Sequence, residues 1–341
     1  KQTMPILGHV LISGSSGEIT ITATDLEVQI SSKFKANISD DFTITLPGRK
    51  LFDILRSLGN TDIELSSENE TAILKTEKSK FSLQQLPANE FPLFDSAEGE
   101  QTFTIKQKDL SDIFNKTQFA MAQQDVRFYL NGLLLEISTE TLNVVGTDGH
   151  RLAKTTSTLD KKNISEQSCI VPRKAIQELT KSLSESKECK VSLVDNQASF
   201  SYSQVTLTTK LIDGTFPDYN RVIPAETTTN IMLDSKVLKP ALQRVSILAN
   251  EKFRGVRIDI DNNKITISSE NPEQEQAVED IDIDETSVKL SIGFNVSYLI
   301  DAVNACSGEL VTLGVNDEST SALITDPSDP NTKYVVMPMR L

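Results

Sequence analysis

The stretch that decides the fold runs from Gly132 to Leu152 and reads GLLLEISTETLNVVGTDGHRL. It contains two runs of alternating apolar and polar residues separated by a polar turn, a pattern typical of a half-buried β-hairpin. Related stretches begin at Gly8 (GHVLISGSSGEITITATDLEV) and at Gly255 (GVRIDIDNNKITISSENPEQE). The three glycines are separated by 124 and 123 residues, which is the length of a small domain. The sequence therefore predicts one domain repeated three times.

A strand followed by a helix recurs on both sides of these hairpins. Before the second and third hairpins the chain reads FTIKQKDLSDIFNKTQFAMA and NIMLDSKVLKPALQRVSILAN, and apolar residues from Leu238 to Ala249 fall on one helical stripe. After the hairpins it reads FTITLPGRKLFDILRSLG, CIVPRKAIQELTKSLSE and KLSIGFNVSYLIDAVNAC. The first repeat has no leader of this kind, so by the repeat logic about two dozen further residues are expected ahead of Lys1.

Further strand-like runs close each repeat, separated by turn-rich breaks. We therefore predict an α+β fold made of three tandem domains, each with two helices and a larger set of antiparallel strands. Pro and Gly among polar residues indicate linkers near 91–101 and 216–228. The predicted domains are 1–98, 99–222 and 223–341.

Composition restricts the class of protein. At 341 residues the chain can form two or three domains with cores of their own. No apolar run approaches the length of a membrane span, and the first residues are too polar for a signal peptide, so a cytoplasmic protein without membrane contact is expected. Cys169, Cys189 and Cys306 are an odd number without metal-site spacing, which favours free thiols. We expect no metal and no cofactor.

The charge is unevenly distributed. The whole chain carries a formal charge of −14, which argues against a simple basic nucleic-acid binder. The predicted helical windows 48–59, 106–123, 172–187, 234–254 and 294–306 carry +2, +1, +2, +3 and −1, a total of +7 that leaves −21 for the rest. Basic charge is therefore concentrated on the helices, although surface helices often carry lysine for solubility alone.

The sequence predicts no active site. His9 and His150 are the only histidines, and neither accompanies a nucleophile motif such as GxSxG. No phosphate-binding glycine loop is present. Acidic pairs such as Asp282 and Asp284 lie in an alternating strand, where a solvated face is their ordinary role. The chain is thus expected not to be an enzyme.

Several motifs together resemble one family. GTDGHRLA in the second repeat, FPDYNRVIP at its end, NEKFRGVRI and NPEQEQA in the third, and YVVMPMRL are similar to the β subunits of bacterial DNA polymerase III, the sliding clamps. The resemblance covers the whole chain. It implies a head-to-tail homodimer closed into a ring, with helices lining a hole that holds duplex DNA and sheets on the outside. It also implies a processivity factor in DNA replication, associated with the nucleoid in the cytoplasm.

The resemblance places basic side chains of the helices towards DNA. A ring retains DNA by topology, so weak contacts with phosphates suffice and permit sliding. The positions expected to face DNA are Lys1, Arg49, Arg56, Lys108, Gln124, Arg173, Lys174, Lys236 and Lys239.

The resemblance also implies a groove between domains two and three. It would take short extended peptides from the α subunit of DNA polymerase III, the clamp loader, other polymerases and repair proteins. Apolar and methionine side chains would form an adaptable pocket there. The matching positions are Leu130, Thr147, Gly149, His150, Arg151, Leu152, Pro217, Arg221, Val222, Asn295, Tyr298, Ser321, Val335, Met337, Pro338, Met339, Arg340 and Leu341. Met339 and Leu341 are expected to turn towards Leu152 and Val222.

The resemblance also assigns a subunit joint between domain one and domain three of the partner. Edge strands left open invite pairing, so a sheet continuous across subunits is expected. The residues matched to this joint are Lys50, Phe81, Leu83, Ile247, Leu248, Glu273, Glu275 and Glu279.

Two other classes remain open from the residues alone. A β-rich repeat protein for adhesion or carbohydrate binding, without a DNA role, fits the composition but does not account for basic helices beside acidic sheets. A hydrolase with paired carboxylates would need two acids facing each other across a cleft.

Overall fold

The computed structural model describes residues 4–95, 101–159, 165–183, 187–194 and 196–340. The chain divides into two compact units, which we call unit 1 (residues 1–107 and 183–211) and unit 2 (residues 108–182 and 212–341). The middle of the chain contributes to both units.

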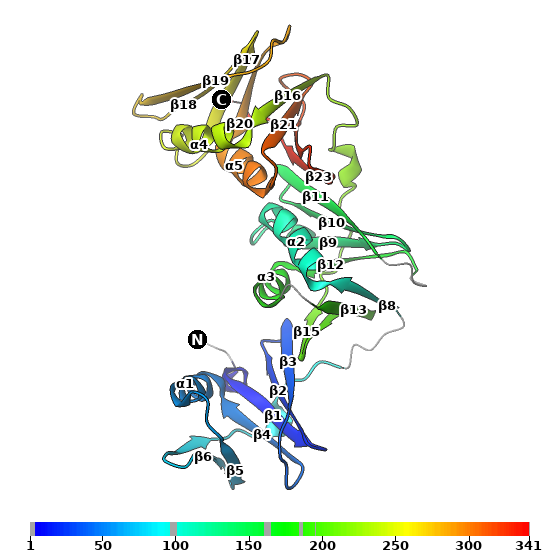
Figure 1. The fold of residues 1–341 in the computed structure, drawn as a ribbon, viewed down its shortest axis with the longest axis vertical. Coiled ribbons are helices and arrows are strands. Elements are labelled where there is room, and N and C mark those ends of the chain that lie inside the picture. Colours follow the sequence, from blue (N-terminus) through cyan, green and yellow to red (C-terminus); the bar gives the residue numbers. More distant parts are fainter. Residues whose placement is uncertain (1–3, 96–100, 160–164, 184–186, 195, 341) are drawn as a thin grey trace. The chain divides into compact units, whose positions relative to one another are not determined.

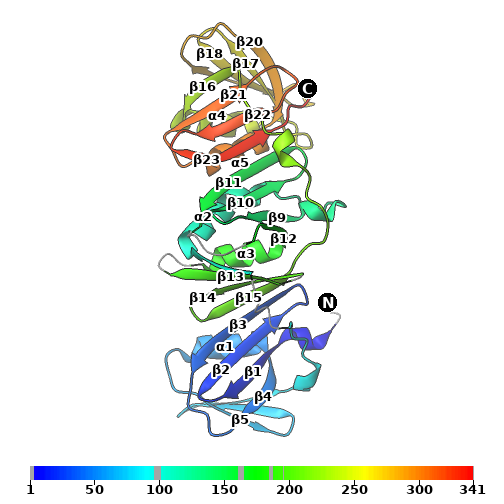
Figure 2. The same cartoon turned by 90° about the vertical axis from the view of Figure 1, so that its right-hand side faces the viewer.

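Unit 1 is built on an eight-stranded antiparallel sheet with the order β4-β1-β2-β3-β15-β14-β13-β8 (Figure 2). Its strands are β1 (His9–Ser15), β2 (Glu18–Thr24), β3 (Val28–Lys35), β4 (Phe42–Pro47), β8 (Gln101–Lys106), β13 (Glu188–Val194), β14 (Gln197–Tyr202) and β15 (Val205–Lys210). A second sheet, β5-β6-β7, comprises β5 (Glu64–Glu68), β6 (Thr71–Lys75) and β7 (Lys80–Gln84).

Helix α1 (Gly48–Leu58) follows β4 directly, and short 3-10 helices lie at η1 (Pro5–Gly8) and η2 (Ala88–Glu90). Leu51 of α1 is buried with Ile12, Leu46, Leu74 and other apolar side chains of both sheets. Burying apolar area of this kind stabilises the unit at roughly 25 cal/mol per Å².

Unit 2 contains a second eight-stranded antiparallel sheet, with the order β12-β9-β10-β11-β23-β22-β21-β16, and a four-stranded sheet, β19-β18-β17-β20. The strands of the first are β9 (Gly132–Ile137), β10 (Thr141–Thr147), β11 (Arg151–Thr158), β12 (Gln167–Pro172), β16 (Thr229–Asp234), β21 (Leu310–Val315), β22 (Ala322–Asp326) and β23 (Asp329–Val336). The strands of the second are β17 (Gly255–Asp261), β18 (Lys264–Glu270), β19 (Gln276–Asp282) and β20 (Lys289–Asn295).

The helices of unit 2 lie along one side of its sheets (Figure 1). They are α2 (Gln107–Thr117), α3 (Arg173–Ser182), α4 (Ser235–Ser246) and α5 (Val296–Ala305), with 3-10 turns η3 (Gln118–Ala120), η4 (Phe128–Leu130) and η5 (Tyr219–Arg221). Side chains of Asp234 and Asn295 accept hydrogen bonds from the first backbone N–H groups of α4 and α5, which caps both helices.

The three hairpins predicted from the repeat are β1–β2, β9–β10 and β17–β18, and each pair is antiparallel. In the first, Ser16 and Gly17 both have positive φ, at 53° and 78°, which suits a two-residue hairpin turn. The predicted strand-then-helix units are present as β8–α2, β16–α4, β4–α1, β12–α3 and β20–α5. The repeat reading is therefore confirmed at the level of the fold.

The repeats join by one rule of strand pairing. The strand that follows a hairpin pairs with the last strand of the next repeat: β3 with β15, and β11 with β23. Each eight-stranded sheet thus consists of four strands from each of two consecutive repeats. In the third repeat the strand that follows the hairpin is β19, and in the first repeat the last strand is β7. Neither has a partner of this kind in the described residues, and each is an edge of its sheet.

The remaining structural facts concern thiols, metals and membranes. Cys169, Cys189 and Cys306 are free, and burial raises the pKa of each thiol to about 12. Within the described ranges no group of three or more candidate metal ligands comes together. No helix in those ranges has both the length and the apolar character that a membrane crossing requires.

Candidate functional site

A cavity of about 200 Å³, which we call the apolar pocket, lies in unit 2 where β11 meets β23. Leu130, Leu152 and Val335 are almost fully buried beneath it, whereas Val222 and Met337 at its rim are 43% and 42% exposed. Leu152 and Val335 are direct partners across the strand pair. An apolar floor with exposed apolar rim groups can bury the side chains of a ligand and exclude water from them.

The turn between β10 and β11 shapes one side of this pocket. Thr147 Oγ1 donates to the carbonyl of Arg151 at 2.6 Å and accepts from the N–H of Gly149 at 3.1 Å. Asp148 Oδ1 accepts from the N–H groups of His150 and Arg151. Gly149 has φ +89°, so this position favours glycine for its backbone conformation.

The side chain of Arg151 makes several contacts within the protein. Its Nε lies 3.0 Å from Asp148 Oδ2 and its Nη1 lies 2.5 Å from Asp301 Oδ2 on α5. Its guanidinium also stacks 4.4 Å from the ring centroid of Tyr298 and donates to the carbonyl of Phe119 at 2.6 Å. Arg151 therefore ties the end of β11 to α5 and fixes the rear of the pocket, with much of its donor capacity used within the protein.

A second internal bond fixes the opposite wall. The hydroxyl of Tyr219, in η5, donates to Glu136 Oε2 on β9 at 2.5 Å. Lys154 Nζ lies 5.2 Å from the centre of the same ring, a cation–π geometry. Burial, and then the hydrogen bond to Glu136, raises the pKa of the Tyr219 hydroxyl, so it stays protonated and keeps donating at neutral pH. Together these contacts hold η5 and the adjoining Val222 against the sheet.

The structure brings together half of the residues expected in the peptide pocket. The predicted residues that line it are Leu130, Thr147, Gly149, Arg151, Leu152, Pro217, Val222, Val335 and Met337. Four others that line it were missed: Arg127, Tyr129, Asp218 and Tyr219. Asp218 and Tyr219 belong to the FPDYNRVIP motif and Tyr129 precedes Leu130, so adjacency to predicted residues could have found these three, but not Arg127.

The remaining predicted pocket residues lie elsewhere. His150 is exposed and its carbonyl accepts from the N–H of Met337 at 2.9 Å. Arg221 projects outward, paired with Asp218 at 3.0 Å. Asn295 caps α5, and Tyr298 stacks on Arg151, where burial and then the charge of Asp148 raise its pKa. Ser321 and Pro338 do not line the pocket, and Leu341 lies outside the described residues.

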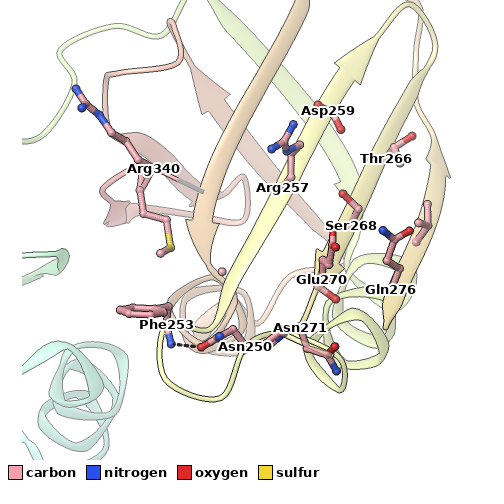
Figure 3. Close-up of a pocket in the computed structure, with 15 residues that line it drawn as sticks. Asn250, Phe253, Arg257, Asp259, Thr266, Ser268, Glu270, Asn271, Gln276 and Arg340 are labelled. Carbon is pink, nitrogen blue, oxygen red and sulfur yellow. Dashed lines mark hydrogen bonds between the residues drawn. The ribbon is translucent and has the colours of Figure 1, made fainter. Parts of the chain in front are cut away.

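Met339 and Arg340 line a different hollow of about 940 Å³, over the outer side of the β17–β18–β19 strands (Figure 3). The N–H of Met339 donates to the carbonyl of Gly293 on β20 at 2.8 Å. This bond carries the chain across the edge of the four-stranded sheet and away from Leu152 and Val222. The expectation that Met339 turns towards those two residues is therefore wrong.

The predicted DNA-facing residues of unit 2 lie on its helices or on the loop after α2. Lys108 and Lys174 are exposed on α2 and α3. Arg173 is half-buried and donates to the carbonyl of Met121 at 3.1 Å. Gln124 is exposed and has φ +56°.

The two α4 lysines differ in exposure and in the groups that they bind within the protein. Lys236 is exposed and pairs with Glu309 at 3.2 Å. The Nζ of Lys239 donates to the carbonyl of Cys306, at the end of α5, at 3.2 Å, so part of its donor capacity is used within the protein.

In unit 1 the predicted DNA-facing residues are on α1. Arg49 and Arg56 are exposed, and Arg49 pairs with Asp53 one turn along the helix at 3.2 Å. Such an exposed pair contributes little and leaves the guanidinium mobile. Lys1 lies outside the described residues.

The residues assigned to a subunit joint lie on the edge strands β7 and β19, just before β19, on α1, or just after α4. Ile247, just after α4, is 75% exposed. Glu279 on β19 makes two hydrogen bonds to Arg244, at 2.6 and 2.9 Å, and these bonds lower its pKa. Leu248 is half-buried, and Glu273 and Glu275 are exposed just before β19.

On the unit 1 side, Phe81 is half-buried on β7 and Lys50 is exposed on α1. Leu83 is only 7% exposed, because it packs in the core with Leu51 and Leu74. A partner could therefore pair with the backbone of β7 here, whereas the Leu83 side chain is directed into the core of its own unit.

Three family models match the chain in succession. They describe the N-terminal, central and C-terminal domains of the DNA polymerase III beta subunit and match residues 1–95, 104–218 and 220–340. The beta sliding clamp of Pseudomonas putida is 41% identical over 345 residues, which cover 100% of this chain and 94% of that protein. The beta sliding clamp of Escherichia coli strain K12 is 39% identical with the same coverage.

Solved structures give the same result. The DNA polymerase III subunit beta of Pseudomonas aeruginosa has a TM-score of 0.97 at 39% identity, and the match covers 100% of this chain and 94% of that one. A clamp from the same organism bound to griselimycin has a TM-score of 0.95 at 40% identity, with 100% and 93% covered. The Caulobacter crescentus pol III beta structure has a TM-score of 0.94 at 33% identity, with 100% and 94% covered. The chain therefore belongs to the family of DNA polymerase III beta subunits, the beta sliding clamps.

Proposed function

We propose that this chain is a processivity factor: two copies close head to tail around duplex DNA and tether the replicative polymerase to it. The observation that carries this proposal is the strand-pairing rule. Two of three equivalent junctions are made within the chain, and the strands of the third, β19 and β7, are unpaired edges in the described structure. Open edges are unstable in isolation and readily pair with a second chain.

Head-to-tail pairing of two copies satisfies every edge of this kind. The β19 strand of each copy would extend the sheet of the partner's β7, which gives two equivalent joints related by a twofold axis. Exposed Ile247 and Val278, which is 61% exposed on β19, would be covered there. The result is a closed assembly of six similar domains.

A closed assembly explains how an acidic protein can act on DNA. Retention by topology needs no tight phosphate contacts, so scattered basic side chains such as Arg56, Lys108, Lys174 and Lys236 suffice to line the opening. Weak contacts of this kind also permit sliding, because no single base or phosphate is held.

The apolar pocket is the proposed attachment point for partner proteins. Its buried floor and exposed rim side chains, Val222 and Met337, suit short peptides with apolar residues. Such peptides would come from the α subunit of DNA polymerase III, the clamp loader, other polymerases and repair proteins. The proposed location is the cytoplasm, at the nucleoid.

The decisive experiment loads the protein onto nicked circular duplex DNA with a clamp loader. We expect the protein to stay bound through gel filtration at moderate salt and to dissociate once the circle is cut. Direct equilibrium binding to a short linear duplex should be weak and fall steeply with salt. Equal retention on circular and linear molecules would overturn the ring and indicate ordinary groove binding.

A β-rich adhesion protein without a DNA role is the alternative left by composition. No feature of the described residues favours it over the clamp, and the family match disfavours it.

A further inference from the structure

The hollow over the β17–β18–β19 strands has the side chains needed for a second contact surface for a peptide. Its floor is formed by Arg257, Ser268 and Gln276, and Phe253 stands at one end with the Met339–Arg340 segment on the adjoining side (Figure 3). Phe253 is 56% exposed although it is aromatic. The hollow therefore combines an uncovered ring and a thioether with charged and amide groups.

The side chain of Arg257 is uncovered because its neighbours on the two adjacent strands are small. It is paired across the sheet with Ser268 on β18 and with Gly293 on β20. Neither neighbour can cover a long side chain, so the guanidinium is exposed. Over the residues that the structure describes, neither Arg257 nor Arg340 has a side-chain ion pair or hydrogen bond. Both retain full capacity to bind a carboxylate.

The hollow also contains two carboxylates, Asp259 on the same strand as Arg257 and Glu270 on the next strand. Across the sheet the order is β20, β17, β18, β19, and the Met339–Arg340 segment bonds to β20. Arg257, on β17, therefore lies one strand nearer to that segment than Glu270, on β18. Asp259 lies two residues along β17 from Arg257. An acidic group that approaches along residues 337–340 reaches Arg257 before it reaches Glu270 on the next strand.

Those same residues connect the hollow to the apolar pocket. Met337 lines the pocket, and its N–H donates to His150. Met339 lines the hollow, and its N–H donates to Gly293. The two methionines are two residues apart, which is about 7 Å in an extended chain. A linear peptide docked in the pocket and extended along residues 337–339 would therefore enter the hollow within a few further residues.

We propose that Arg257 forms a separate subsite for an acidic residue that lies a few residues outside the apolar core of a partner peptide. This inference rests on the proposed function, because the peptide must first dock in the apolar pocket. The subsite adds selectivity among partners, since peptides with the same apolar core would differ in affinity according to the charge of their flanks.

The test uses synthetic peptides and fluorescence anisotropy. The short probe is a labelled pentapeptide with one glutamine and two leucines. It is extended at one end or the other by two serines and a terminal Asp, Asn or Lys. We expect one of the two Asp-extended peptides to bind roughly two- to fivefold more tightly than its Asn version, the range of an exposed ion pair. The Lys version should gain nothing, and added salt should shrink the difference.

Two variants make the test specific to the site. Arg257→Gln should abolish the gain from Asp while leaving the affinity of the short probe unchanged. Lys289→Gln is the matched control: it removes one positive charge from β20 of the same sheet, where Lys289 pairs with Asp261 at 3.1 Å, and it should preserve the gain. Absence of a gain with both Asp peptides, or a gain that survives Arg257→Gln, would overturn the subsite. A short probe that fails to bind the unaltered protein would instead overturn the pocket assignment, and the subsite with it.

Discussion

Replacing Tyr219 by phenylalanine tests whether the internal bond to Glu136 holds the wall of the apolar pocket. The change removes one hydroxyl whose hydrogen bond to a carboxylate is 2.5 Å long, and it keeps the aromatic ring. Hydrogen bonds to charged groups contribute roughly 1.5–3 kcal/mol. Glu136 is half-buried, so water can partly replace the lost donor, and we expect a loss near the lower end, about 1.5 kcal/mol. The contact of Lys154 with the ring is retained.

That loss should appear in peptide binding because η5 carries the wall of the pocket. With the bond gone, η5 and Val222 are free to move, and a peptide must order them on binding. We expect Tyr219→Phe to weaken a short Gln- and Leu-containing peptide roughly three- to tenfold in calorimetric titration, with most of the effect in the dissociation rate.

Substitutions of Glu136 serve as controls for this prediction. Glu136→Gln keeps an oxygen that can accept from the tyrosine hydroxyl, and it should bind the peptide within about twofold of the unaltered protein. Glu136→Ala should resemble Tyr219→Phe. If Tyr219→Phe lowers the urea midpoint but binds the peptide normally, the bond supports the fold alone and the reasoning about the pocket wall is refuted.

Three further predictions concern the joint, the domain junction and acid. Replacing Ile247 and Leu248 by alanine should give monomers by light scattering, and a dimer that persists at micromolar concentration would place the joint elsewhere. Arg151→Ala leaves two carboxylates without their partner and should cost about 3 kcal/mol of stability in denaturant unfolding; an unchanged midpoint would contradict the contacts described. Burial of Asp326 opposes its ionisation, yet hydrogen bonds from Ser328 and other donors outweigh burial and lower its pKa below 3.8. Its contribution to stability is therefore present above pH 3.8 and lost as the pH falls through the folded pKa. In Asp326→Asn the free energy of unfolding should therefore depend less steeply on pH in that range, as measured by denaturant unfolding at several pH values.

Much of the fold could be read from the sequence because local patterns determine it. The hairpins, the strand-then-helix units and the three repeats depend on alternation, helical spacing and turn residues within short stretches, and all are present in the structure. Family motifs likewise indicated Leu152, Val335 and Met337, which do line the apolar pocket.

Partner choice and side-chain direction could not be read in this way, because they depend on groups far apart in the chain. The sequence could not reveal that Arg151 pairs with Asp301, since that contact spans 150 residues. It placed Met339 in the pocket, whereas one backbone bond to Gly293 directs it into the neighbouring hollow.

The sequence by itself determined the repeated domain and its elements, because hydrophobic periodicity and turn chemistry act over a few residues. Only the tertiary structure decided which strands are joined and which edges, β7 and β19, have no pairing partner among the described residues. The physical reason is that strand pairing between repeats is set by backbone hydrogen bonds and buried surfaces that form only when distant segments meet.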